Sequence, residues 1–233
     1  MYALDATSGE VRWSYLTGGR VTSGPAVNRE VTAFVSQDRY LYLIDTSTGR
    51  RRLDFPTSPV RGAPTIHGDH VFVADEDGVV RAIDWREIYL PLEKATRRVR
   101  TQLFIWGLVG SLPPQKGFVW GFRGSGESFV GTPVVANGTV YIGSTSGALF
   151  ALNESTGKLE WKFQGKAGMA SSPSVAGRTV FVGDEDGRLY SINALTGEPQ
   201  WQFMADASIS STPVNTNGTL YITTMDGTLY AIQ

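Results

Sequence analysis

The chain lacks cysteine entirely and has only two histidines among its 233 residues. The absence of cysteine excludes disulfides, thiolate metal sites and cysteine nucleophiles. Both histidines, His67 and His70, lie in one predicted turn. We therefore expect neither a histidine general base nor a zinc site there.

Charged residues and long apolar runs are also scarce. Charged residues make up 18% of the chain and the formal net charge is −1, so no general attraction to nucleic acid or anionic membranes is expected. The most apolar run, residues 103–112, is about half the roughly 20 residues that a membrane helix needs. Met1 is followed directly by strand-like sequence rather than by a signal peptide.

Glycine is abundant instead, at 27 residues, and the chain repeats itself. The phrase MYALDATSGEVRW at 1–13 returns as LFALNESTGKLEW at 149–161 and as LYSINALTGEPQW at 189–201. One position of the repeat is aromatic in five units, where it is Tyr2, Tyr42, Phe150, Tyr190 and Tyr230. In one further unit Arg81 fills this position. A period of about 40 residues with only strand and turn signals indicates the blade of a β-propeller.

Each repeat unit predicts four short antiparallel strands. A proline such as Pro133 opens the first strand, where the ladder requires no donor. Asn-Gly, Asp-Gly and Thr-Gly turns then reverse the chain, because these residues adopt positive φ at low cost. The predicted fold class is therefore all-β: a β-propeller of about five four-stranded blades, in a closed or an incomplete ring, with one helical insertion.

The repeated motif Ala-x-Asp-x-x-Thr-Gly-x-x-x-Trp resembles the tryptophan-docking motif of the quinoprotein (pyrroloquinoline-quinone-type) β-propeller family. One unit departs from it, with Leu43 and Leu53 at the Ala and Trp positions. In the family, the docking tryptophan packs between neighbouring blades. The resemblance therefore implies a structural docking role for Trp13, Trp120, Trp161, Trp201, Gly9, Gly49, Gly157 and Gly197.

The family pattern also gives a blade count. Four blades are complete, at about 23–55, 62–122, 131–163 and 171–203. Residues 2–15 supply the last two strands of a blade, and 211–232 supply the first three. Residues 10–15 could complete the C-terminal blade beside 229–232 and close a five-bladed ring. A truncated chain with an incomplete ring is favoured instead, and its open blade edges would allow dimerisation.

Residues 85–119 interrupt the repeat, so the predicted propeller comprises residues 1–84 and 120–233. The interruption holds six Lys and Arg residues against two Glu, a net charge of +4. It predicts a basic amphipathic helix from about Pro91 to Val109, stopped by Pro113-Pro114. Its apolar stripe contains Leu92, Ala95, Val99, Leu103, Trp106 and Val109.

The predicted helix has three possible settings. The simplest setting is packing against the propeller. The helix could instead dock on a protein partner or lie on an anionic membrane. Its candidate partner or membrane contacts are Arg97, Arg98, Arg100, Phe104 and Trp106.

The leading functional hypothesis is a non-enzymatic scaffold or protein-interaction module of the cell envelope. It rests on a resemblance to the propeller lipoprotein of the outer-membrane β-barrel assembly machinery, which also implies a periplasmic or otherwise extracytoplasmic location. The alternatives are a fragment of a quinone-dependent dehydrogenase and a ligand-binding sensor domain of a larger membrane protein.

The chemistry of the dehydrogenases cannot be placed on this chain. In the dehydrogenases, the resemblance implies an adjacent-cysteine pair and acidic ligands to Ca²⁺. No residues of this chain match either feature. The segments 75–78 and 184–187, both Asp-Glu-Asp-Gly, fit hairpin turns better than calcium loops. We expect no catalytic residue, no cofactor and no metal site. The expected partner is a protein and not nucleic acid.

Overall fold

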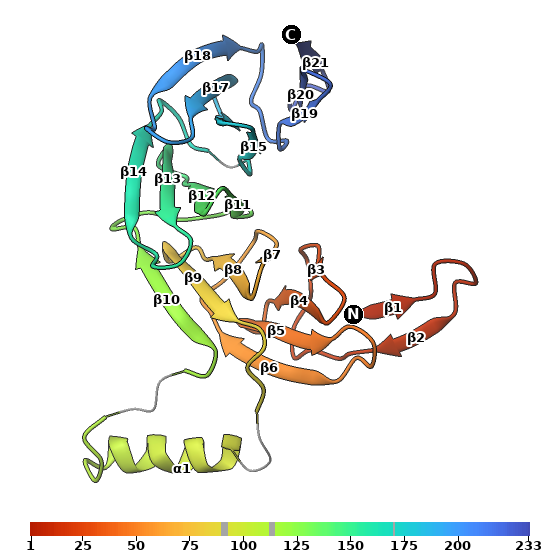
Figure 1. The fold of residues 1–233 in the computed structure, drawn as a ribbon, viewed down its shortest axis with the longest axis vertical. Helices are drawn as coiled ribbons and strands as arrows, with labels where there is room; N and C mark the ends of the chain where they lie inside the picture. The colour runs from red at the N-terminus through yellow and green to blue at the C-terminus, as the bar shows by residue number, and fades with distance from the viewer. Residues whose placement is uncertain (90–92, 112–114, 170) are drawn as a thin grey trace.

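The computed structural model describes residues 1–89, 93–111, 115–169 and 171–233, and only the backbone of Lys94, Ala95 and Arg98. Within these residues the chain forms small antiparallel sheets arranged one after another along an arc, with the helix α1 outside it (Figure 1). This arrangement is an open β-propeller.

Four of the sheets are complete blades of four strands, as the repeat predicts. Blade 1 contains β3 (Ala26–Val27), β4 (Val31–Ser36), β5 (Tyr40–Asp45) and β6 (Arg51–Pro56). Blade 2 contains β7 (Thr65–His67), β8 (His70–Ala74), β9 (Val79–Asp84) and β10 (Phe118–Arg123). Blade 3 contains β11 (Val134–Ala136), β12 (Thr139–Gly143), β13 (Ala148–Asn153) and β14 (Leu159–Gln164). Blade 4 contains β15 (Ser174–Ala176), β16 (Thr179–Gly183), β17 (Arg188–Asn193) and β18 (Pro199–Met204).

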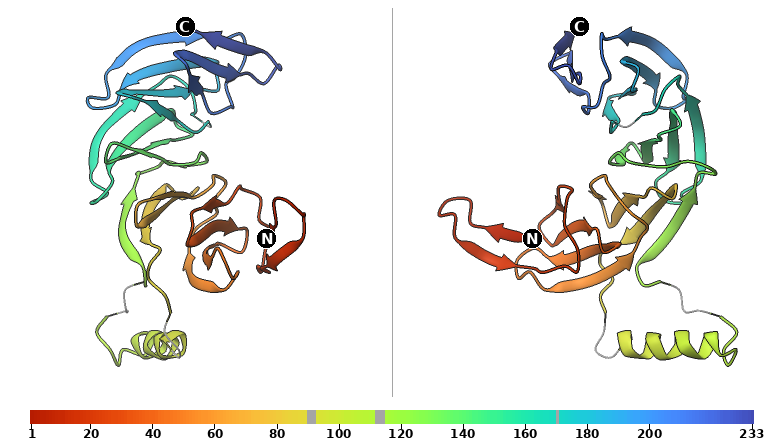
Figure 2. Two further views of the ribbon diagram at one scale, coloured as in Figure 1. Left: turned by 45° about the vertical axis from the view of Figure 1, so that its right-hand side comes forward. Right: turned by 180° about the vertical axis from the view of Figure 1, so that it is seen from behind.

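The two ends of the arc carry smaller sheets. An N-terminal hairpin pairs β1 (Tyr2–Leu4) with β2 (Val11–Ser14), and a C-terminal three-stranded blade contains β19 (Val214–Thr216), β20 (Thr219–Thr223) and β21 (Leu229–Ile232). The two sheets do not pair with each other, and Figure 2 shows them well apart. The five-bladed closure through residues 10–15 is therefore wrong. The reason is local: Tyr2 pairs with Ser14, and Met1 and Tyr15 exchange backbone hydrogen bonds, so β2 stays in the hairpin.

The hydrophobic cores lie between consecutive blades. All six residues of β4 and all five of β12 are buried, because each of these strands is covered on both faces. Between blades 2 and 3, for example, Phe72 packs in one cluster with Ile142 and Leu152. Stability therefore depends on interfaces between neighbouring blades, as in other repeat proteins.

The outer face of the N-terminal hairpin is uncovered. Tyr2 and Leu4 are 68% and 56% exposed, whereas their repeat counterparts in blade 3, Phe150 and Leu152, are 3% and 0% exposed. This face is available for association, and dimerisation through it stays a prediction.

The turn between β5 and β6 is built on the carboxylate of Asp45. Its Oδ1 accepts hydrogen bonds from the backbone amides and hydroxyls of Ser47 and Thr48. These bonds, with the Ser47 hydroxyl first, lower the pKa of Asp45 to about 2 because they stabilise the ionised form. Asn153 and Asn193 accept the same backbone bonds in blades 3 and 4, so the turn itself needs no charge.

Asp45→Asn should therefore weaken the acid sensitivity of the fold. A carboxyl whose folded-state pKa is depressed stabilises the fold above its unfolded pKa of about 4, and that stabilisation disappears as the pH falls through its folded value of about 2. Urea unfolding at several pH values in this window should show a smaller loss of stability in the variant than in the wild type. Equal losses in the two proteins would contradict this account.

The insertion contains the helix α1 (Glu93–Ile105), which is shorter than predicted. It ends because Gly107 adopts a φ of 71° and the amide of Leu108 donates to the carbonyl of Leu103, a Schellman cap. The predicted helical positions 91 and 92 and the predicted stop at 113–114 lie outside the described residues. No described helix is long and apolar enough to cross a bilayer.

The borders of the insertion are held by blade 2. Trp85 is only 6% exposed, packs in the core between blades 1 and 2, and donates its indole N–H to the carbonyl of Gly68 at 2.9 Å. At the other border, strand β10 already begins at Phe118. The chain therefore leaves and re-enters the propeller at fixed points.

Candidate functional site at the helical insertion

Three of the four predicted docking tryptophans contact a motif glycine of the next blade. In each contact the indole lies so close that a Cβ on the glycine would collide with it. Each indole Nε1–H also donates to a carbonyl in the same turn, at 2.8 to 3.0 Å. The contacts join Trp13 to Gly49 and the Thr46 carbonyl, Trp120 to Gly157 and the Glu154 carbonyl, and Trp161 to Gly197 and the Ala194 carbonyl.

The remaining two predicted docking residues lie near the ends of the arc. Gly9 has φ 74° but open space around its α-carbon, and Trp201 is 42% exposed beside Phe181. Between blades 1 and 2, Leu53 takes the place of the indole and lies against Gly117. In the sequence, Leu53 is visible as a departure from the motif at the Trp position. It did not identify Gly117, because the insertion displaces that turn from its usual spacing.

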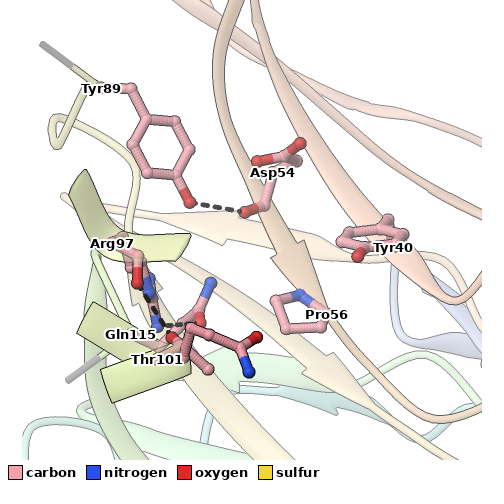
Figure 3. Close-up of a pocket in the computed structure, with 8 residues that line it drawn as sticks. Tyr40, Asp54, Pro56, Tyr89, Arg97, Thr101 and Gln115 are labelled. Atoms are coloured by element: carbon pink, nitrogen blue, oxygen red, sulfur yellow. Dashed lines mark hydrogen bonds between the residues drawn. The ribbon is translucent and has the colours of Figure 1, made fainter. Parts of the chain in front are cut away.

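A cleft of about 530 Å³ lies between α1 and the rim of blade 1 (Figure 3). Blade 1 contributes aromatic and polar groups from β5 and β6, and the insertion contributes mostly polar side chains. The lining consists of Tyr40, Asp54, Pro56, Tyr89, Arg97, Thr101, Gln102 and Gln115. None of these except Arg97 was singled out by the sequence, because they converge only when the insertion folds back on blade 1.

Two polar contacts within the insertion and one to blade 1 lie beside this cleft. Arg97 donates to the side chain of Gln115, and the ammonium of Lys116 lies 2.6 Å from a carboxylate oxygen of Glu93. The Tyr89 hydroxyl donates to the carbonyl of Asp54 at 3.4 Å. Burial raises the pKa of Tyr89, and the nearby Asp54 carboxylate adds to this effect, so its hydroxyl remains a donor at neutral pH.

The helix turns its polar side toward the cleft and apolar residues toward solvent. Arg97 and Thr101 line the cleft, whereas Val99 and Trp106 of the predicted apolar stripe are 60% and 65% exposed. The expectation that this stripe packs against the propeller is therefore wrong for these residues.

The other predicted contact residues are distributed around the helix. Arg100 is exposed, and Phe104 is 37% exposed. The side chain of Arg98 lies outside the described structure. The insertion therefore offers an exposed cationic and apolar surface in addition to the cleft.

The two Asp-Glu-Asp-Gly segments are hairpin turns. The Asp75 carboxylate is fully buried, accepts the amide N–H of Val79 and pairs with Arg81. In blade 4, the Tyr190 hydroxyl donates to Asp184 in the same way, at 2.9 Å. This explains why Arg81 can fill the aromatic position. Across the described residues, no group of three acidic or histidine side chains is placed to hold a metal ion.

Comparison with known sequences gives a family match over most of the chain. The family model described as outer membrane protein assembly factor BamB matches residues 1–88 and 107–233. The outer membrane protein assembly factor BamB of Yersinia pestis is 26% identical over 168 residues, which are 70% of this chain and 38% of that protein. The chain thus spans well under half of this relative. The unmatched residues 89–106 contain α1, so the helix is an addition to the family pattern.

Comparison with solved structures supports the fold. BamB from Moraxella catarrhalis superimposes with a TM-score of 0.57 at 16% identity, covering 96% of this chain and 86% of that one. The quinohemoprotein alcohol dehydrogenase ADHIIG from Pseudomonas putida HK5 superimposes with a TM-score of 0.64 at 17% identity, covering 92% of this chain and 40% of that one. At these identities the likeness concerns the fold alone.

Proposed function

Because the chain belongs to the outer membrane protein assembly factor BamB family, we propose that it is a non-enzymatic scaffold that holds a protein partner during outer membrane protein assembly. The family match over residues 1–88 and 107–233 carries this proposal. Its site of action is extracytoplasmic. Its working unit is one propeller body, residues 1–84 and 120–233, that carries the insertion 85–119.

The architecture supports a scaffold role. Blades locked by indole–glycine contacts form a stiff arc, and a stiff surface binds a partner at a low cost in conformational entropy. In the two Asp-Glu-Asp-Gly segments, the carboxylates of Asp75 and Asp184 accept hydrogen bonds within their own hairpins. The proposed function therefore lies in surfaces rather than in catalytic groups.

We place the protein contact at the cleft between α1 and blade 1. Tyr40, Tyr89 and Arg97 line it, and tyrosine and arginine are among the residue types enriched at the energetic centres of protein interfaces. A volume of about 530 Å³ suits one or two side chains of an inserted segment.

This function is testable in the bacterium that carries the gene. Deletion should lower the amount of folded porin in outer membrane fractions, and the wild-type gene should restore it. The variant Tyr40→Ala/Arg97→Ala should restore it only partly, because it removes two cleft contacts. Arg178→Ala, an exposed change on blade 4, serves as the control and should restore it fully.

Two outcomes would count against the scaffold proposal. One is an unchanged porin level after deletion. The other is alcohol-dependent dye reduction by the purified chain after addition of pyrroloquinoline quinone and Ca²⁺. That activity would favour the second candidate, a quinone-dependent dehydrogenase, which the fold likeness to ADHIIG supports.

A further inference from the structure

The second half of α1 and the cap that follows it carry a cluster of exposed apolar residues. Val99, Ile105, Trp106 and Leu108 are 60%, 67%, 65% and 67% exposed, and we call these four the outer apolar patch. They lie on the last turns of α1 and in the cap that follows it. Clustered large apolar side chains on a soluble surface mark a contact site.

The propeller does not cover this patch. Within the insertion, Arg97 of the helix donates to Gln115, and Glu93 of the helix pairs with Lys116. No residue of the described helix belongs to the hydrophobic clusters between the blades. The patch is therefore available for a partner outside the chain.

We propose that the outer apolar patch inserts into the headgroup region of a bilayer that contains anionic lipid. This goes beyond the scaffold function, since it concerns the residues that the family pattern does not include. An amphipathic helix that combines Trp and branched apolar residues with arginines is the type that lies in the membrane interface. The indole of Trp106 suits this region because it has both an apolar ring and a polar N–H.

The charge distribution favours a lipid surface and sets the orientation. Residues 85–119 carry a net charge of +4, which leaves the rest of the chain at −5. Arg100 is exposed on the helix, close in sequence to Val99 and within two turns of Ile105. An anionic membrane would attract the insertion and repel the remaining surface, so the contact would be made by the insertion alone.

The shape of the insertion also points to a bilayer. Figures 1 and 2 place α1 outside the arc of blades, as a projection rather than a groove. A projecting apolar surface needs a partner that can deform around it, and lipid does so without a preformed cavity. An acidic protein with a matching groove is the rival partner, and vesicle binding separates the two.

Co-sedimentation with vesicles tests the proposal. The wild-type chain should bind vesicles of phosphatidylcholine with about 30% phosphatidylglycerol, bind pure phosphatidylcholine less, and release as salt is raised. Ile105→Ser/Trp106→Ser/Leu108→Ser should bind at least about tenfold more weakly, because three inserted side chains are lost. The control Leu16→Ser/Leu195→Ser/Met225→Ser removes three side chains that are 94%, 66% and 70% exposed elsewhere, and it should bind like the wild type.

A second readout does not depend on the triple variant. Brominated lipid should quench part of the fluorescence of the wild-type chain, and Trp106→Phe should remove that part. The proposal is overturned if the wild type stays in the supernatant at low salt, which would direct the search to an acidic protein. It is also overturned if both triple variants lose binding equally, or if Trp106→Phe leaves the quenching unchanged.

Discussion

Trp120→Ala is expected to lower the free energy of unfolding by about 3–5 kcal/mol, the largest effect of any single substitution considered for this chain. The indole is 6% exposed, packs in the cluster between blades 2 and 3, and donates to the Glu154 carbonyl at 2.8 Å. Truncation would open a cavity at an interface and leave a carbonyl without its donor. Urea-induced unfolding, followed by far-UV circular dichroism, measures the change.

Trp201→Ala is the matched control for this substitution. Trp201 occupies the same position of the repeat, but it is 42% exposed and rests beside Phe181. Its loss should cost roughly 1 kcal/mol, in the range of partly exposed positions. Equal losses for the two tryptophans would show that the interface between blades 2 and 3 contributes no extra stability.

Gly197→Ala is expected to cost about 1–3 kcal/mol more than Gly9→Ala, although both glycines have φ 74°. Placing alanine in this left-handed conformation costs about 1–2 kcal/mol at either site. At Gly197 the added Cβ would also lie 2.7 Å from the ring of Trp161, whereas at Gly9 it meets nothing within 4 Å. The indole would have to move away from its blade.

The comparison of the two glycines isolates the docking contact from backbone strain. Thermal and urea unfolding of both variants give the difference directly. If the two substitutions cost the same, the contact with Trp161 adds nothing to the strain. Gly197 and Gly9 occupy the same position of the repeat, so the local sequences of the two turns are similar.

Part of the candidate site could be predicted, and part could not. Arg97 and Trp106 were singled out because a basic amphipathic pattern is visible in the sequence. Their orientation was not predictable, since Arg97 meets Gln115 only when the two ends of the insertion come together beside the cleft. Tyr40 and Asp54 belong to ordinary blade strands, and only the position of α1 makes them part of a cleft.

The sequence by itself determined the blades. The strands and hairpin turns follow from short-range chemistry: prolines that open strands, residues that accept positive φ, and aromatic residues at a fixed period. The docking glycines came from the resemblance to the quinoprotein repeat. The open ring, which the sequence favoured, is confirmed by the structure. The tertiary structure alone decided the contact of Leu53 with Gly117 in place of an indole contact, and the exposure of the apolar patch. These features depend on contacts between residues far apart in the chain, and a local pattern carries no information about which distant groups will meet.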